Sequence, residues 1–133
     1  MSQRLEGKKI VVTAAGQGIG KATAIAFHNE GAHVIATDLN DKTLADLNKE
    51  FPSIVVKTLD STNNSAILDF TKSLDKVDVL FNAVGFVHHG SILDCEEKDW
   101  DFSSDVNVKS MYFMCKAILP VSYTHLRAHE TRH

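Results

Sequence analysis

Short runs of aliphatic and β-branched residues recur along the first 81 residues of this sequence, and their starts lie 20 to 24 residues apart. Within each run the apolar residues are successive rather than alternate, which is typical of parallel strands covered by helices on both faces. Between the runs, apolar residues have helical spacing. The predicted strands are residues 10–12, 34–36, 54–56 and 77–81, and the predicted helices between them are residues 18–30, 41–51 and 62–74.

Strands that alternate with helices in this way predict an α/β fold. Because crossovers between parallel strands are right-handed, the expected architecture is a doubly wound parallel sheet. Asn40 or Asp41 is the predicted N-cap of the second helix, and Ser61 or Thr62 that of the third.

The pattern changes after Gly85. A loop over residues 86–95 is expected to lead into a longer helical stretch from about residue 96 to 119. Pro120 is expected to kink or weaken that helix because proline lacks a backbone N–H.

Composition narrows the class of protein. The 133 residues carry a net charge of −3, with 44% hydrophobic and 23% charged residues, so no basic excess indicates a nucleic-acid partner. No apolar run approaches the ~18 residues of a membrane span, and the N-terminus lacks the apolar segment of a secretory signal. The two cysteines, Cys95 and Cys115, do not form a disulfide framework. We therefore expect a cytoplasmic protein without nucleic-acid or membrane partners.

A glycine-rich turn follows the first predicted strand, with Gly16, Gly18 and Gly20 where the strand passes into a helix. Such glycines let the backbone approach a ligand, and the free N–H groups at a helix start bind anions. The triphosphate-binding motif G-x-x-x-x-G-K-[ST] does not match, because Ala15 and Ala22 occupy its ends, and the strict G-x-G-x-x-G fingerprint fails at its last step.

Asp38 ends the second predicted strand, 20 residues after Gly18. A carboxylate at this place accepts hydrogen bonds from an adenosine ribose and opposes a 2′-phosphate. Two unit charges about 4 Å apart interact by about 4 kcal/mol at an effective dielectric constant of 20. No arginine lies nearby and residue 17 is glutamine, so Asp38 favours NAD over NADP.

With these residues, the sequence resembles the short-chain dehydrogenase/reductase family over residues 5 to about 120. The glycine turn matches the family's T-G-x-x-x-G-x-G except that Ala14 stands at the first glycine, and residues 82–85 keep the first and last members of its N-N-A-G. Asp60 matches the family's adenine-contacting aspartate, and Asn107 matches an asparagine of its catalytic proton relay.

The resemblance implies a Rossmann-type sheet with strand order 3-2-1-4 and an NAD-dependent oxidoreductase. It also implies a small hydroxy or oxo carboxylic acid as substrate, of the (R)-3-hydroxybutyrate or 4-oxoproline type, and a homo-oligomer, a tetramer in full-length members. Asn107 is the expected catalytic residue. The expected cofactor-binding residues are Thr13, Gln17, Gly18, Ile19, Gly20, Asp38, Asp60, Asn82 and Gly85.

By the same resemblance, catalysis needs a tyrosine, a lysine four residues later and a serine from the preceding strand, all on elements expected beyond this chain. Tyr123 with Arg127 is not accepted as this set, since arginine is a poor substitute for the lysine point charge. We therefore expect residues 1–120 to form the NAD-binding half and residues 121–133 to be a non-native tail. The chain alone is expected to be inactive, and the alternative is a non-catalytic dinucleotide-binding module.

Two histidine motifs raise the question of a metal. The last five residues, HETRH, fit H-E-x-x-H, but a zinc peptidase needs a third protein ligand and a pocket, so this remains a remote alternative. The neighbouring His88 and His89 point in different directions, and the sequence shows no further ligand beside them. We expect no metal site.

Overall fold

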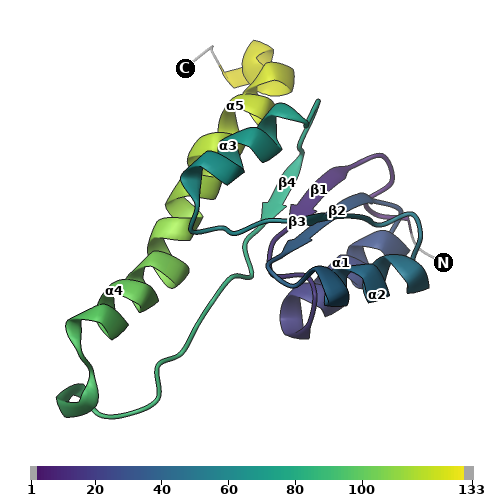
Figure 1. The fold of residues 1–133 in the computed structure, drawn as a ribbon. Coiled ribbons are helices and arrows are strands. Elements are labelled where there is room, and N and C mark those ends of the chain that lie inside the picture. The colour runs from purple at the N-terminus through teal and green to yellow at the C-terminus, as the bar shows by residue number, and fades with distance from the viewer. Residues whose placement is uncertain (1–2, 131–133) are drawn as a thin grey trace.

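The computed structural model describes residues 3–130, with side chains described for residues 3–122. Four strands form one parallel sheet in the order β3-β2-β1-β4 (Figure 1). This order confirms the doubly wound sheet expected from the sequence. The strands are β1 (Lys9–Val12), β2 (His33–Asp38), β3 (Val55–Thr58) and β4 (Val79–Phe81).

Helices cover both faces of the sheet (Figure 1). On one face lie α1 (Gly18–Asn29) and α2 (Asp41–Glu50), and on the other lie α3 (Asn64–Lys72) and α5 (Ser110–Glu130). Among the described residues, no helix has the length and hydropathy needed to cross a membrane.

Strand β1 shows why a strand with helices on both faces needs successive apolar residues, since each face buries alternate side chains. Ile10 and Val12 belong to the core under α1 and α2, whereas Val11 belongs to the core under α3 and α5. All three side chains are at most 1% exposed, and burial of each contributes roughly 1.5–3 kcal/mol relative to exposure. The register places Ile10 between Val34 of β2 and Val79 of β4.

The segment after β4 follows the expected loop, and its helical stretch begins near residue 96 as predicted. The loop, a 3-10 turn, helix α4 and a π-helical segment together form an arm that extends away from the sheet (Figure 1). The expected helix end near residue 119 is wrong, because α5 continues through Pro120. Past the proline, Val121 packs against the second core and Ser122 Oγ donates a hydrogen bond to Val77 O at 2.8 Å. The bounds are η1 (Ile92–Asp94), α4 (Glu97–Ser104) and η2 (Asp105–Lys109).

The helix caps follow the sequence in part. Asn40 caps α2, and its Oδ1 accepts hydrogen bonds from Lys42 N and Thr43 N, as predicted. The prediction of Ser61 or Thr62 as the cap of α3 is wrong, because Asn63 Oδ1 accepts from Ala66 N at 3.1 Å.

Candidate dinucleotide site

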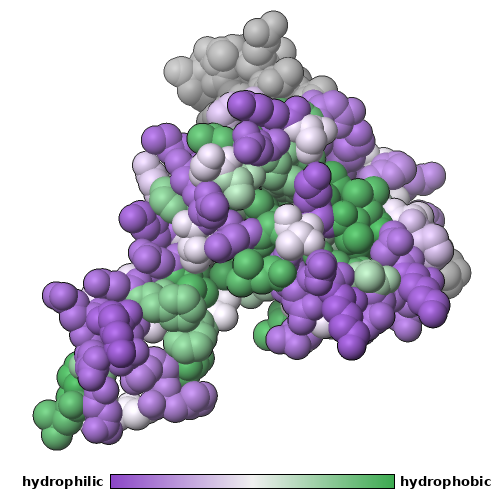
Figure 2. All heavy atoms as spheres, in the orientation of Figure 1, coloured by the Kyte–Doolittle hydropathy of each residue, from purple (hydrophilic) through white to green (hydrophobic). Residues whose placement is uncertain are grey.

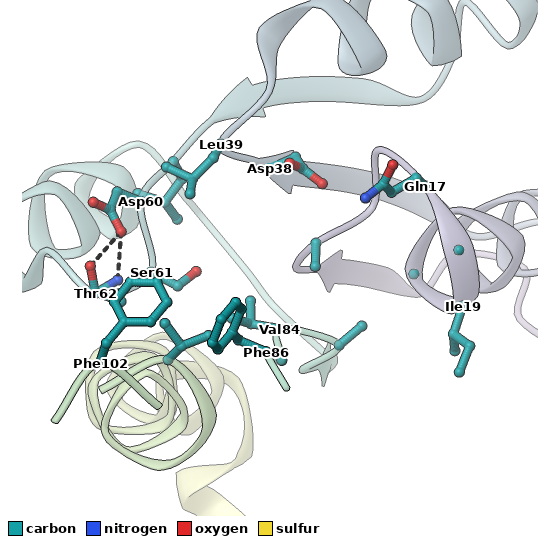
Figure 3. Close-up of a pocket in the computed structure, with 17 residues that line it drawn as sticks. Gln17, Ile19, Asp38, Leu39, Asp60, Ser61, Thr62, Val84, Phe86 and Phe102 are labelled. Atoms are coloured by element: carbon teal, nitrogen blue, oxygen red, sulfur yellow. Dashed lines mark hydrogen bonds between the residues drawn. The ribbon is translucent and has the colours of Figure 1, made fainter. Parts of the chain in front are cut away.

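A cleft of about 470 Å³ lies at the carboxyl ends of the four strands. Ligands of open α/β sheets bind at this edge, next to the point where the strand order reverses, and the volume suits a small-molecule site. Figure 3 shows Gln17, Ile19 and Asp38 on one side of the cleft and Asp60, Thr62 and Phe102 on the other. The cleft is lined by Ala14, Gln17, Gly18, Ile19, Gly20, Asp38, Leu39, Leu59, Asp60, Ser61, Thr62, Ala83, Val84, Gly85, Phe86, Phe102 and Val106.

The turn between β1 and α1 forms one wall, and its backbone depends on two glycines. Gly18 has φ +60°, and Ala14, at the family's first glycine position, has φ +52°. A Cβ on Gly20 would collide with the carbonyl oxygen of Ala14. Gln17 precedes α1 in extended conformation and its side chain makes no capping hydrogen bond. The first N–H groups of α1 are therefore available to an anion in the cleft.

Asp38 joins the end of β2 to this turn. Its Oδ2 accepts a hydrogen bond from Gly16 N at 2.8 Å, and its Oδ1 accepts one from Asn40 N at 3.0 Å. A Cβ on Gly16 would meet Asp38 Oδ2 at 2.9 Å, so a glycine is required for this approach. A carboxylate has about four lone-pair positions, and Asp38 therefore keeps acceptor capacity for ribose hydroxyls while it holds the turn.

Asp60 lies across the cleft, after β3. Its Oδ1 accepts hydrogen bonds from Thr62 N at 2.9 Å and from Thr62 Oγ1 at 2.6 Å (Figure 3). This local turn ends before α3 begins, which explains why Thr62 does not cap that helix. The sequence prediction correctly placed Asp60 at the cleft, and its contact with adenine stays a prediction.

Thr13 and Asn82 lie outside the set of residues that line the cleft. Thr13 is fully buried, and its Oγ1 accepts a hydrogen bond from Ala83 N at 3.0 Å while it donates to Asn82 Oδ1 at 3.5 Å. Both residues thus join the end of β1 to the end of β4 and position the backbone of the wall. Direct contact of either side chain with a cofactor stays a prediction.

Asn107 lies in the π-helical segment and holds the loop after β4. Its Oδ1 accepts from Phe86 N and its Nδ2 donates to Phe86 O, both at 2.8 Å. Phe86 lines the cleft and packs edge-on against Phe102, with ring centroids 4.9 Å apart. Single-turn π segments are frequent at functional sites. The structure thus gives Asn107 a positioning contact that the sequence did not show, and its part in a proton relay stays a prediction.

The spacing Y-x-x-x-K also occurs on α5, at Tyr112 and Lys116. Lys116 Nζ donates to Tyr112 OH at 3.3 Å and lies 5.6 Å from the centroid of its ring. Tyr112 is 55% exposed and neither residue lines the cleft. Ser122 donates its hydrogen bond to the carbonyl oxygen of Val77, just before β4, and the side chains of Tyr123, Arg127 and the HETRH motif lie outside the described residues.

The loop after β4 corrects one expectation about His88. Cys95 and Asp99 lie beside it, so the expectation that no further ligand clusters there is wrong. The sequence could not show this, because the contact depends on how the loop returns to the start of α4.

Comparisons with known proteins bear on this geometry. The family model described as short chain dehydrogenase matches residues 8–127. The chain is 60% identical over 117 residues to "Dehydrogenase/reductase SDR family member 6" of Rattus norvegicus, covering 88% of this chain and 47% of the relative. It is 48% identical over 117 residues to "2-keto-3-deoxy-L-fuconate dehydrogenase" of Xanthomonas campestris pv. campestris, covering 88% and 39%. The chain therefore spans about half the length, or less, of these relatives.

A solved structure supports the same fold. A short-chain dehydrogenase/reductase of the glucose/ribitol dehydrogenase type from Brucella melitensis superposes with a TM-score of 0.85 at 24% identity, over 92% of this chain and 54% of that one. Since its identity is low, this likeness bears on the fold alone. The family model covers most of the described chain, and the chain belongs to the short-chain dehydrogenase family.

Proposed function

We propose that this chain is the dinucleotide-binding half of an NAD-dependent oxidoreductase that acts in the cytoplasm. The proposal rests on the hydrogen bond of 2.8 Å from Gly16 N, in the glycine turn, to Asp38 Oδ2, which holds the turn and this carboxylate together at the cleft. The turn offers helix N–H groups to a pyrophosphate, and Asp38 offers oxygen acceptors to a ribose.

The choice of NAD over NADP rests on charge. In the part of the chain whose side chains are described, no arginine or lysine lines the cleft, while Asp38 and Asp60 both line it. A 2′-phosphate bound at the ribose position would meet the Asp38 carboxylate without a cation to offset the repulsion. An unphosphorylated ribose would instead donate hydrogen bonds to the same oxygens.

The proposed substrate is a small hydroxy or oxo carboxylic acid, with (R)-3-hydroxybutyrate and 4-oxo-L-proline as the leading candidates. The sequence from residue 80 to 120 resembles cytosolic type 2 (R)-3-hydroxybutyrate dehydrogenases. A relative named for 2-keto-3-deoxy-L-fuconate supports the class, since that compound is also an oxo acid. When bound, the nicotinamide ring would take up the hydride from the alcohol carbon. In this chain, Asn107 and Phe86 would shape the wall nearest the loop.

The second candidate is a dinucleotide-binding module without catalysis. Among the described residues, the lining of the cleft contains no tyrosine, lysine, histidine or cysteine to move a proton, which favours binding without turnover by this chain alone. The proposal assigns the oxidoreductase activity to the full-length protein, which is expected to form a homo-oligomer, a tetramer.

Titration calorimetry with NAD, together with an NADH absorbance assay with (R)-3-hydroxybutyrate, separates the two candidates. We expect the 133-residue chain to bind NAD and to form no NADH. The same NAD-binding segment joined to the remaining half of a short-chain dehydrogenase is expected to form NADH. Absence of NAD binding would refute the site, and turnover by the chain alone would refute the expected inactivity.

A further inference from the structure

The arm that extends away from the sheet holds a group of metal-binding atoms outside the dinucleotide cleft. His88, in the loop after β4, lies with Cys95 and Asp99 at the start of α4, and one ligand atom from each lies within 4.8 Å of the others. The Nε2 atom of His88 is buried and makes no hydrogen bond within the described part of the chain. An unpaired buried imidazole nitrogen is costly, and a bound cation removes that cost.

We propose that His88, Cys95 and Asp99 bind a zinc ion. Imidazole nitrogen, thiolate sulfur and carboxylate oxygen are the three donor types that zinc accepts in proteins. A tetrahedral zinc with bonds of 2.0–2.3 Å sets its ligand atoms roughly 3.3–3.8 Å apart, so any pair of ligand atoms at the 4.8 Å limit would have to close by about 1 Å. Gly90 has φ +140° next to His88 and Asp94, and the wide range of backbone angles open to a glycine would let the loop adjust at this point.

Each donor is free to bind an ion in its present surroundings. Cys95 Sγ donates a long hydrogen bond, 3.6 Å, to Glu96 O, and its thiol proton would be released on zinc binding. Asp99 Oδ2 accepts from Glu96 N at 3.1 Å as part of the capping box of α4, and the carboxylate keeps further lone pairs for a metal. All three residues are partly exposed, so an ion can enter and water can fill the fourth position.

The local charge suits a dication. The thiolate of Cys95 and the carboxylate of Asp99 together balance the two charges of zinc. The N-terminus of α4 repels cations through its dipole, but Glu97 and Asp99 in its first turn offset that field. Asp94 adds a further carboxylate on the same side of Gly90 as His88: a Cβ on Gly90 would lie 3.8 Å from Asp94 Oδ2 and 3.7 Å from His88 Nε2.

A bound ion would fasten the loop after β4 to the start of α4. That loop begins at the cleft with Phe86, which is held by Asn107 and packs on Phe102 of α4. Zinc would therefore fix the arm near its tip, while the Asn107 contact with Phe86 fixes its base. The inference does not depend on which dinucleotide or substrate the cleft binds.

The test measures zinc binding by the full chain with His125, His129 and His133 replaced by alanine, so that the tail histidines cannot chelate the ion. Competition with a chromogenic chelator gives the affinity, and cobalt substitution gives a thiolate-to-cobalt charge-transfer band. We expect one zinc per chain and a cobalt–thiolate band. In this background, Cys95→Ser and His88→Gln are expected to weaken zinc binding by about tenfold or more, as losses around metal sites do.

Matched controls are Cys115→Ser and His89→Gln, which change the other thiol and the neighbouring imidazole and are expected to leave zinc affinity unchanged. Circular dichroism of each variant checks that the fold is kept. Zinc affinity that stays within about twofold after Cys95→Ser or His88→Gln, or a cobalt complex without a thiolate band, would overturn the proposal. Loss of affinity in the Cys115→Ser control would equally overturn it, since that would place the site elsewhere.

Discussion

A Gly20→Ala substitution places a methyl group against the backbone of the turn that faces the cleft. The added carbon would lie 2.8 Å from the Ala14 carbonyl carbon and 3.1 Å from Thr13 O, and closer still to Ala14 O. These atoms are main chain, and Ala14 already adopts φ +52°, so the turn must move to admit the methyl group. Overpacking of this kind costs about 1–3 kcal/mol.

The helix partly offsets this cost, because alanine is favoured over glycine in a helix by up to about 1 kcal/mol, and Gly20 lies in the first turn of α1. The net loss of unfolding free energy is therefore expected to be up to about 2–3 kcal/mol. Because the turn moves where N–H groups meet the pyrophosphate, NAD affinity is expected to fall by about tenfold, equivalent to about 1.4 kcal/mol. Urea unfolding measures the first quantity and titration calorimetry the second.

Gly7→Ala is the matched control. Gly7 has φ +80° and open space around it, and it does not line the cleft. An alanine there is expected to cost about 1 kcal/mol of stability from backbone strain, with NAD affinity unchanged. If Gly20→Ala keeps both the stability and the NAD affinity of the parent chain, the close approach of helix and turn does not constrain the site.

Three further changes test other parts of the structure. Burial tends to raise the pKa of Asp78, but a hydrogen bond from Lys9 N and the ion pair with Lys76 hold this pKa below its ordinary value of 3.8. The ionised Asp78 therefore stabilises the fold above pH 3.8, and this stabilisation is lost as the pH falls below that value. Asp78→Asn should flatten the acid limb of a stability–pH curve, and an unchanged limb would contradict this. Asn107→Ala removes two hydrogen bonds to Phe86, so hydrogen exchange at the Phe86 amide should rise and the free energy of unfolding should fall by about 1–2 kcal/mol. Unchanged exchange at Phe86 would refute the role of Asn107 in holding this loop. Strand β4 lies at the edge of the sheet, and Val79 on it is 38% exposed, so this edge is expected to pair with other copies of the chain. Val79→Lys should reduce the resulting self-association in sedimentation; equal self-association of the variant and the parent chain would contradict this.

The spacing of apolar residues predicted the sheet because it reflects which side chains of each strand are buried. Val11 between Ile10 and Val12 indicated cover on both faces, and the two cores confirm it. Since parallel strands end at the same edge, the sequence also placed the glycine turn, Asp38 and Asp60 around one cleft.

The remaining features depend on contacts between distant residues, which a local pattern does not carry. The Asn107 contact with Phe86 needs a π-helical segment to turn the amide toward the loop. The cluster around His88 needs the loop to fold back on α4. The continuation of α5 past Pro120 depends on packing against the second core, which compensates for the missing N–H. The origin of residues 121–133 stays a prediction.

Figure 2 shows a consequence of the arm that the sequence also did not reveal. Its tip presents hydrophobic surface, and Ile92 and Leu93 are 79% and 92% exposed. These side chains follow a loop with no regular period, so no sequence pattern indicated that they would lie away from a core.

Calorimetric titration of the parent chain with NAD and with NADP tests the central claim most directly. Asp38 is expected to make NAD bind at least about tenfold more tightly, well within the roughly 4 kcal/mol available from charge repulsion. Asp38→Asn should bring the two affinities within about threefold, and Asp41→Asn, an exposed carboxylate outside the cleft, should leave the preference intact. NADP that binds the parent chain as tightly as NAD would contradict the account.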